Sequence, residues 1–200
     1  MYTLFNKRPL EEGRRNQQLA FIESNTKPCM NNVRVELIPW VHSDEYMVHR
    51  MALKYIASLP PGSYLGMEIS GPVLTNYEKD IQDSKEILVG MWNGKFLIAP
   101  LEADYRAMMQ VILACHKRGV HIVPIENHDV FSKATLATTD SVNREAHMIM
   151  NAVSTIEQLP RAMGSFHVLT GAAHTHNLYD FLRRNGIPVI VRTRLFEYAR

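Results

Sequence analysis

The chain has 200 residues, of which 46% are hydrophobic and 21% are charged, and its formal net charge is +2. This length is enough for one substantial hydrophobic core but short for two domains, so we expect one soluble globular domain. A net charge this close to zero gives no electrostatic reason to expect nucleic acid or an anionic membrane as the main partner.

The cysteines and the N-terminus bear on the compartment. Cys29 falls in a polar segment and Cys115 on an expected helix, which favours reduced thiols over a disulfide. Charged residues occupy the N-terminal segment where a signal peptide has its apolar core, and no later segment approaches the roughly 20 apolar residues of a membrane span. We therefore expect a cytoplasmic protein, although secretion without a cleaved signal is compatible with the same sequence.

The N-terminal part of the chain differs in character from the rest. Residues 1–32 are polar and irregular, and we interpret them as an arm that precedes an α/β domain at residues 33–200. The domain begins over 33–41 with alternating and then continuous apolar residues, a pattern typical of a strand. This first strand ends at His42.

The next segments predict a helix and a second strand. Apolar residues recur every three or four positions over 44–59 and indicate a helix. Residues 64–69 are typical of a strand and carry Glu68 near its carboxyl end. The segment 71–99 is ambiguous, with either short strands or a hairpin around Asn93-Gly94.

The remaining segments continue the alternation of strands and helices. The patterns predict a helix over 100–118, a strand over 120–125, a helix over about 140–158, a strand over 166–170, a helix ending at Arg184 and a strand over 187–191. Repeated strand, helix, strand units imply an α/β fold with a largely parallel central sheet, right-handed crossovers and helices on both faces.

Polar residues follow several of the predicted strands. Parallel strands present their carboxyl ends at one edge of a sheet, so His42, Glu68, residues 126–129 and His174 should approach one another there. Two imidazoles and a carboxylate, from His42, His174 and Glu68, can bind Zn or Mn. They can also pair as a general base and an orienting acid. The residue types alone leave these alternatives open.

Glu68 needs a partner, because an unpaired carboxylate within an apolar strand is strongly destabilising. A metal ion would serve, and so would Arg144, which falls in the first turn of its helix on the same face as Asn151. A guanidinium there can bind a carboxylate, a phosphate or a developing oxyanion. Helical spacing alone nevertheless favours a simpler interpretation, in which Arg144 and Glu145 are ordinary solvated charges.

Several common motifs are absent from the sequence. It contains no Gly-x-Gly-x-x-Gly and no Walker A loop, which weakens nucleotide-cofactor functions, and no Gly-x-Ser-x-Gly of a serine hydrolase. Neither cysteine has a convincing catalytic setting, and there is no Cys-x-x-Cys for structural zinc.

Three patches, in order, resemble the elements of a known superfamily. Residues 39–42, Pro-Trp-Val-His, are similar to its first Gly-x-x-His element, and Glu68 to the strand glutamate that follows. Residues 144–151 are similar to its Arg-acidic-x-x-Met-x-x-Asn helix, and residues 171–174, Gly-Ala-Ala-His, to its closing Gly-x-x-His. The chain thus resembles the group that contains erythromycin esterases, TraB and Tiki-type proteins and the haem-binding ChaN lipoproteins.

The resemblance implies an α/β fold in which two histidines, a glutamate and an arginine face one cleft used for hydrolysis, with metal in some branches. We therefore hypothesise a hydrolase that cleaves an ester, amide or peptide bond of a small-molecule or peptide substrate. His42 would be a general base or metal ligand, and Glu68 would orient it or join the metal shell. Arg144 would bind the substrate oxygen, and His174 would supply the second imidazole.

Further residues and alternatives complete the hypothesis. Asn127, His128 and Asn151 are candidates for substrate binding. The cofactor would be a divalent metal, Zn or Mn, bound by His42, Glu68 and His174.

Pro39 stands where glycine is usual and the acidic residue of the esterase element is missing, which motivates a non-catalytic protein that binds haem or another metal-containing ligand. A secreted effector module acting on a protein partner is a third alternative, and the oligomeric state is left open.

Overall fold

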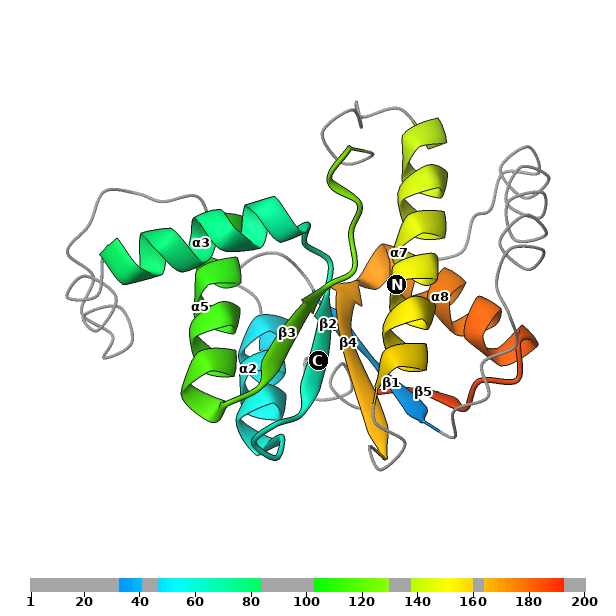
Figure 1. Cartoon of the computed structure of the whole chain (residues 1–200), viewed down its shortest axis with the longest axis horizontal. Helices are drawn as coiled ribbons and strands as arrows, with labels where there is room; N and C mark the ends of the chain where they lie inside the picture. Colours follow the sequence, from blue (N-terminus) through cyan, green and yellow to red (C-terminus); the bar gives the residue numbers. More distant parts are fainter. Residues whose placement is uncertain (1–32, 41–46, 84–102, 130–137, 160–163, 193–200) are drawn as a thin grey trace.

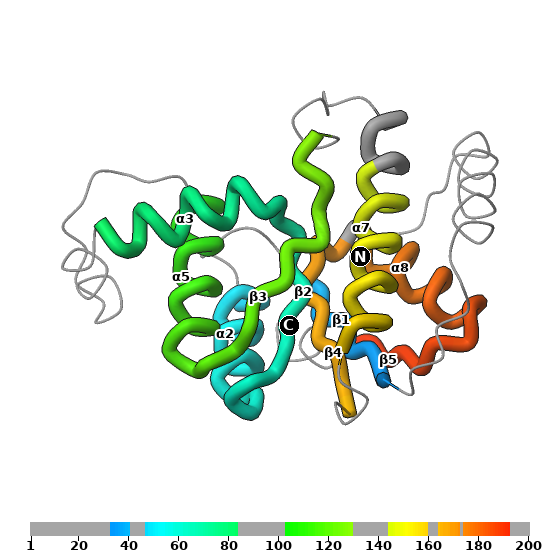
Figure 2. The backbone as a smooth tube through the Cα atoms, viewed as in Figure 1, coloured from blue at the N-terminus to red at the C-terminus, as the bar shows by residue number. Residues whose placement is uncertain are grey.

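Five parallel strands form the central sheet of the molecule. The computed structural model describes residues 33–40, 47–83, 103–129, 138–159 and 164–192 (Figure 1), and Figure 2 follows the same backbone as a tube. The strands are β1 (Arg34–Trp40), β2 (Tyr64–Met67), β3 (His121–Pro124), β4 (Ser165–Gly171) and β5 (Val189–Val191), in the order β3-β2-β4-β1-β5. Every neighbouring pair is parallel. The predicted α/β fold is confirmed, and this sheet is parallel throughout.

Helices cover both faces of the sheet, as predicted. The helices of the described ranges are α2 (Met47–Ser58), α3 (Gly71–Asp83), α5 (Ala103–Arg118), α7 (Thr138–Gln158) and α8 (Ala172–Arg184). Figure 1 shows α2, α3 and α5 together on one side, where α5 contacts both α2 and α3, and α7 beside α8 on the other. Each group encloses its own apolar core against the sheet.

The first strand shows how one sequence serves both cores. Val35 and Leu37 join the core beneath α7 and α8, whereas Ile38 and Trp40 join the core beneath α2, α3 and α5. Successive side chains of a strand point to opposite faces, and a parallel strand between two helical layers has to bury both. This requirement explains the nearly continuous apolar run.

A buried carboxylate also lies in β1. Glu36 accepts hydrogen bonds from Tyr55 of α2 at 2.7 Å and from Nε of Arg192 at 2.9 Å, and a guanidinium nitrogen of Arg34 lies 2.9 Å from its other oxygen. Burial favours the neutral carboxyl, but the bonds to Tyr55 and Arg192 outweigh it and lower the pKa of Glu36. Glu36 thereby joins α2 and the end of β5 to the middle of the sheet.

The chain reverses its direction of winding between β2 and β4. These strands are neighbours, but β2 leads into α3 and α5 on one face and β4 leads into α8 on the other. Open α/β sheets bind their ligands at the carboxyl ends of two strands that diverge in this way. Glu68 directly follows β2 and His174 lies in the first turn of α8, so both are at this point.

The ambiguous segment begins with a helix that the sequence analysis did not predict. Helix α3 places Val73, Leu74, Tyr77 and Ile81 toward the core at helical spacing, but only Leu74 is fully buried. An apolar stripe this weak is hard to distinguish from a polar loop. The strands or hairpin expected further along, the N-terminal arm and His42 lie outside the described residues.

Cys115 and the described helices bear on the cysteine and membrane predictions. Cys115 lies on α5 as expected and has a free, buried thiol, and burial raises its pKa to about 12. Cys29 lies outside the described residues. No helix in the described ranges combines the length and the apolar character needed to cross a membrane.

Close packing around β2 predicts a strong effect at Gly66. An added Cβ would lie 2.9 Å from Cζ of Phe166 and 3.2 Å from Cγ2 of Ile125. Gly66→Ala should lower the free energy of unfolding by about 1–3 kcal/mol, because overpacking forces neighbouring side chains from their positions. Gly164→Ala, where no atom lies within 4 Å of the new Cβ, is the control and should change it by less than about 0.5 kcal/mol. Equal stabilities in urea denaturation would contradict this packing.

Candidate active site

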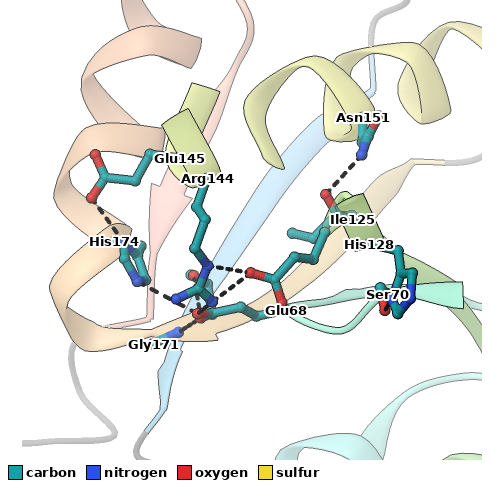
Figure 3. Close-up of polar contacts among 11 residues, drawn as sticks. Glu68, Ser70, Ile125, His128, Arg144, Glu145, Asn151, Gly171 and His174 are labelled. Carbon is teal, nitrogen blue, oxygen red and sulfur yellow. Dashed lines mark hydrogen bonds and ion pairs between the residues drawn. The ribbon is translucent and has the colours of Figure 1, made fainter. Parts of the chain in front are cut away.

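The carboxylate of Glu68 lies at the centre of the candidate site (Figure 3). One oxygen, Oε2, accepts a hydrogen bond from the Gly171 backbone N–H at 2.7 Å and a longer one from Oγ1 of Thr170 at 3.5 Å. The other, Oε1, lies 3.1 Å from a guanidinium nitrogen of Arg144 and 3.4 Å from Nε2 of His174. Glu68 is only 8% exposed, so these groups replace its water. It joins the ends of β2 and β4 to α7 and α8.

Arg144 bridges two buried carboxylates. Its Nε donates to Oε1 of Glu126 at 2.5 Å, and its terminal nitrogen contacts the same oxygen as well as Glu68. Backbone pairing continues past β2 and β3, where the N–H of Glu126 donates to the carbonyl of Ile69 at 3.2 Å. Burial raises the pKa of Glu126, and the neighbouring Arg144 offsets only part of that rise.

A third carboxylate, that of Glu145, orients His174. Nδ1 of His174 lies 2.8 Å from Oε1 of Glu145, whose other oxygen accepts from the side-chain amide of Asn177. Because an ionised carboxylate only accepts, the shorter contact places a proton on Nδ1, and the second proton of the imidazolium, on Nε2, faces Glu68 at 3.4 Å. Burial disfavours the imidazolium, but the bond to Glu145 and the charges of Glu68 and Glu145 outweigh it, so the pKa of His174 is raised above 6.5.

Gly171 is required for space rather than for an unusual backbone angle. Its backbone dihedrals are φ −52° and ψ 139°, which any residue adopts. A Cβ at this position, however, would lie 3.0 Å from Oε2 of Glu68. The glycine therefore lets the backbone N–H approach the carboxylate closely.

These groups line one side of a cavity of about 550 Å³ at the carboxyl edge of the sheet. The polar side carries the four charged or titratable groups Glu68, Glu126, Arg144 and His174. The opposite side comes from the ends of β1 and β2 and from α3 and α5. It has an apolar wall made by Trp40, Ile69, Val73, Tyr77 and Met108, and it also carries the polar side chains of Ser70 and Asp104. A cavity of this size, with a few convergent polar groups on one wall, is suited to a small-molecule ligand.

The structure brings three of the four predicted catalytic residues together. Glu68, Arg144 and His174 meet as expected from their positions after β2, in α7 and after β4, and His42 lies outside the described residues. The interpretation of Arg144 and Glu145 as solvated helix charges is wrong. Their side chains are 20% and 15% exposed, and both are engaged in ion pairs.

The three predicted substrate-binding residues have other contacts in the structure. The Asn151 amide donates to the Ile125 carbonyl at 3.0 Å, and Oδ1 of Asn127 accepts from a backbone N–H at 3.0 Å. Nδ1 of His128 lies 3.1 Å from Oγ of Ser70, which itself lines the cavity (Figure 3). None of the three is among the cavity-lining residues in the described part of the chain, and their role in substrate binding stays a prediction.

Two carboxylates of the site had no predicted role. Glu126 belongs to residues 126–129, which the sequence places at this edge of the sheet, but substrate binding is predicted for its neighbours Asn127 and His128. Glu145 occupies the acidic position of the patch that begins at Arg144, yet no pattern in the sequence links it to His174. The apolar wall was also overlooked, because the helix α3 that supplies much of it was not predicted.

The predicted metal site includes Glu68 and His174, which are in contact in the structure. Within the described ranges, no group of three or more His, Cys, Asp or Glu side chains is arranged to hold a metal ion. The positive charge beside Glu68 and Glu126 is the guanidinium of Arg144. Glu68 and His174 are two of the three predicted ligands and the third, His42, lies outside the described residues, so Zn or Mn binding stays a prediction.

Comparisons of the chain with protein-family models, with curated proteins and with solved structures find no significant match. The fold and the contacts of the candidate site therefore carry the functional argument.

The buried position of Glu68 predicts a measurable loss of stability on substitution. Glu68→Gln should lower the free energy of unfolding by about 1–3 kcal/mol, because it leaves buried partners incompletely satisfied. Glu78→Gln is the matched control, since the pair between Glu78 and His116 is largely exposed and its loss should cost less than about 0.5 kcal/mol. Denaturant titration of both variants measures the difference, and equal losses would argue against a buried, bonded Glu68.

Proposed function

We propose that the protein is a hydrolase that cleaves an ester or amide bond, with His174 as the general base. The observation that carries this proposal is the oriented pair of Glu145 and His174, which directs Nε2 of the imidazole toward Glu68, and both His174 and Glu68 line the cavity. A carboxylate that holds the proton of the neutral imidazole on Nδ1 makes Nε2 the nitrogen that accepts a further proton, and the nearby Glu68 stabilises the imidazolium that results. This arrangement suits the activation of a water molecule.

The proposed reaction proceeds by direct attack of water. Nε2 of His174 takes one proton from the water as its oxygen attacks the carbonyl carbon, and the negative charges of Glu68 and Glu145 stabilise the imidazolium that forms. Arg144, oriented by Glu68 and Glu126, polarises the carbonyl oxygen and stabilises the tetrahedral oxyanion. As the oxyanion collapses, the imidazolium returns the proton to the leaving alcohol or amine, and the acid is released.

The resemblance to the erythromycin esterase, TraB and ChaN group supports the same class of reaction, through Glu68, Arg144 and His174. The same resemblance implies that His42 adds a second imidazole to this site. A metal-dependent reaction, with Zn or Mn bound by His42, Glu68 and His174, stays the alternative form of the same proposal.

Removal of the imidazole should abolish most of the activity. With a panel of chromogenic esters and anilides, His174→Ala should lower kcat/KM by about 10²- to 10⁴-fold, the usual contribution of general base catalysis. His176→Ala is the control, because His176 lies on the same helix, is 41% exposed and pairs with Asp180. An unchanged rate in a folded His174→Ala protein would refute the assignment.

The raised pKa of His174 also predicts the pH dependence. The base must be neutral to accept a proton, so kcat/KM should rise with pH through a midpoint above 6.5, where His174 loses its charge. Glu145→Gln removes one of the negative charges that stabilise the imidazolium, and the midpoint should move to lower pH. A midpoint that is the same in both proteins would mean that another group is titrating.

The cofactor and binding-protein alternatives are tested on the same purified sample. Loss of turnover on chelation, followed by recovery with Zn or Mn, would favour the metal-dependent form. Saturable uptake of haem in a protein that hydrolyses no member of the panel would favour the non-catalytic alternative. Turnover that survives chelation would support water activation by His174 alone.

A further inference from the structure

The two walls of the cavity differ in chemistry, and the apolar wall has no part in the proposed reaction. Val73 and Tyr77 lie one helical turn apart on α3, and Met108 of α5 lies beside them in the same apolar core and lines the same cavity. Trp40 closes this wall at the end of β1, where its indole N–H donates to Nδ1 of the buried His49 at 3.2 Å. The wall is therefore aromatic and aliphatic, and a hydrogen bond fixes its indole.

The charges that line the cavity are mostly negative among the described residues. Glu68, Glu126 and the exposed Asp104 supply three carboxylates, against the single permanent cation Arg144. That cation forms ion pairs with both Glu68 and Glu126, which balance its charge. Asp104 lies on the side of the cavity away from them, in the first turn of α5 and near enough to Tyr77 to contribute to the raised pKa of that phenol.

We propose, on the basis of the hydrolase function above, that the substrate is an uncharged or cationic ester or amide with a bulky apolar group beside the scissile bond. The apolar group lies on the wall formed by Val73, Tyr77 and Met108, and the scissile bond faces His174 and Arg144. Anionic substrates such as phosphoesters and carboxylate-bearing esters are disfavoured. They would enter a cavity lined by three carboxylates, which repel a second negative charge on the substrate.

Two fluorescent probes with the same aromatic body test the proposal without requiring turnover. N-phenylnaphthylamine is neutral, and anilinonaphthalene sulfonate carries an added negative charge. The neutral probe should bind the full chain with a Kd about tenfold lower or more, because the sulfonate meets like charge and loses its hydration. A sulfonate that binds as tightly as the neutral probe would overturn the proposal.

Variants locate the probe on the apolar wall. Tyr77→Ala should raise the Kd of the neutral probe about fivefold or more, because it removes aromatic contact area. Tyr179→Ala is the control, since Tyr179 packs on the core beneath α7 and α8 and does not line the cavity in the described part of the chain. Asp104→Asn removes one of the lining carboxylates and should therefore reduce the difference in Kd between the neutral probe and the sulfonate. Equal effects of the two tyrosine substitutions would place the probe elsewhere.

Ester hydrolysis then links the wall to the reaction. Among para-nitrophenyl esters, an apolar acyl group such as benzoyl should give a kcat/KM about tenfold or more above that of the hemisuccinate, and Tyr77→Ala should reduce the advantage. If His174→Ala lowers kcat/KM but the acyl group does not affect it, the proposed substrate class is refuted and the proposed hydrolase function stands. Probe discrimination without turnover would refute the hydrolase and leave the ligand preference of the cavity intact.

Discussion

A carboxylate removed from water must be surrounded by donors, and the rest of the candidate site depends on how Glu68 meets this requirement. Its donors and charged neighbours come from the backbone at the end of β4, from α7 and from the first turn of α8. Each of these elements is fixed relative to β2 through one side chain. Arg144 also binds Glu126 at the end of β3, and Glu145 holds the other ring nitrogen of His174.

The topology of the sheet explains why charged side chains and an apolar wall meet at the carboxyl ends of β2 and β4. The chain leaves β2 toward one helical layer and β4 toward the other, so the carboxyl ends of these strands open a space between the layers. One layer, α7 and α8, contributes the arginine and the histidine. The other, α3 and α5, contributes the apolar wall. A bound molecule would therefore contact reactive groups on one side and apolar side chains on the other.

The sequence was sufficient to predict the α/β fold and the meeting of Glu68 with His174, because strand periodicity and parallel strand ends are local signals with a fixed geometric consequence. It was insufficient for the pairs formed by α7. Arg144 and Glu145 are consecutive and point about 100° apart around the helix. Only the position of α7 in the fold shows that Arg144 reaches Glu68 and Glu126. The same position brings Glu145 to His174. Such tertiary placement leaves no local pattern in the sequence. The apolar wall of the cavity was not predicted either, because the apolar face of α3 is too weak to indicate a helix.

The central claim is that buried carboxylates set the protonation of His174, and NMR titration of the labelled imidazole measures this directly. The account predicts a His174 titration midpoint above 6.5, with the proton of the neutral form on Nδ1, and a lower midpoint in the Glu68→Gln variant. A midpoint at or below 6.5 that Glu68→Gln leaves unchanged would contradict the claim, because the imidazole would then be independent of the carboxylate around which the site is built.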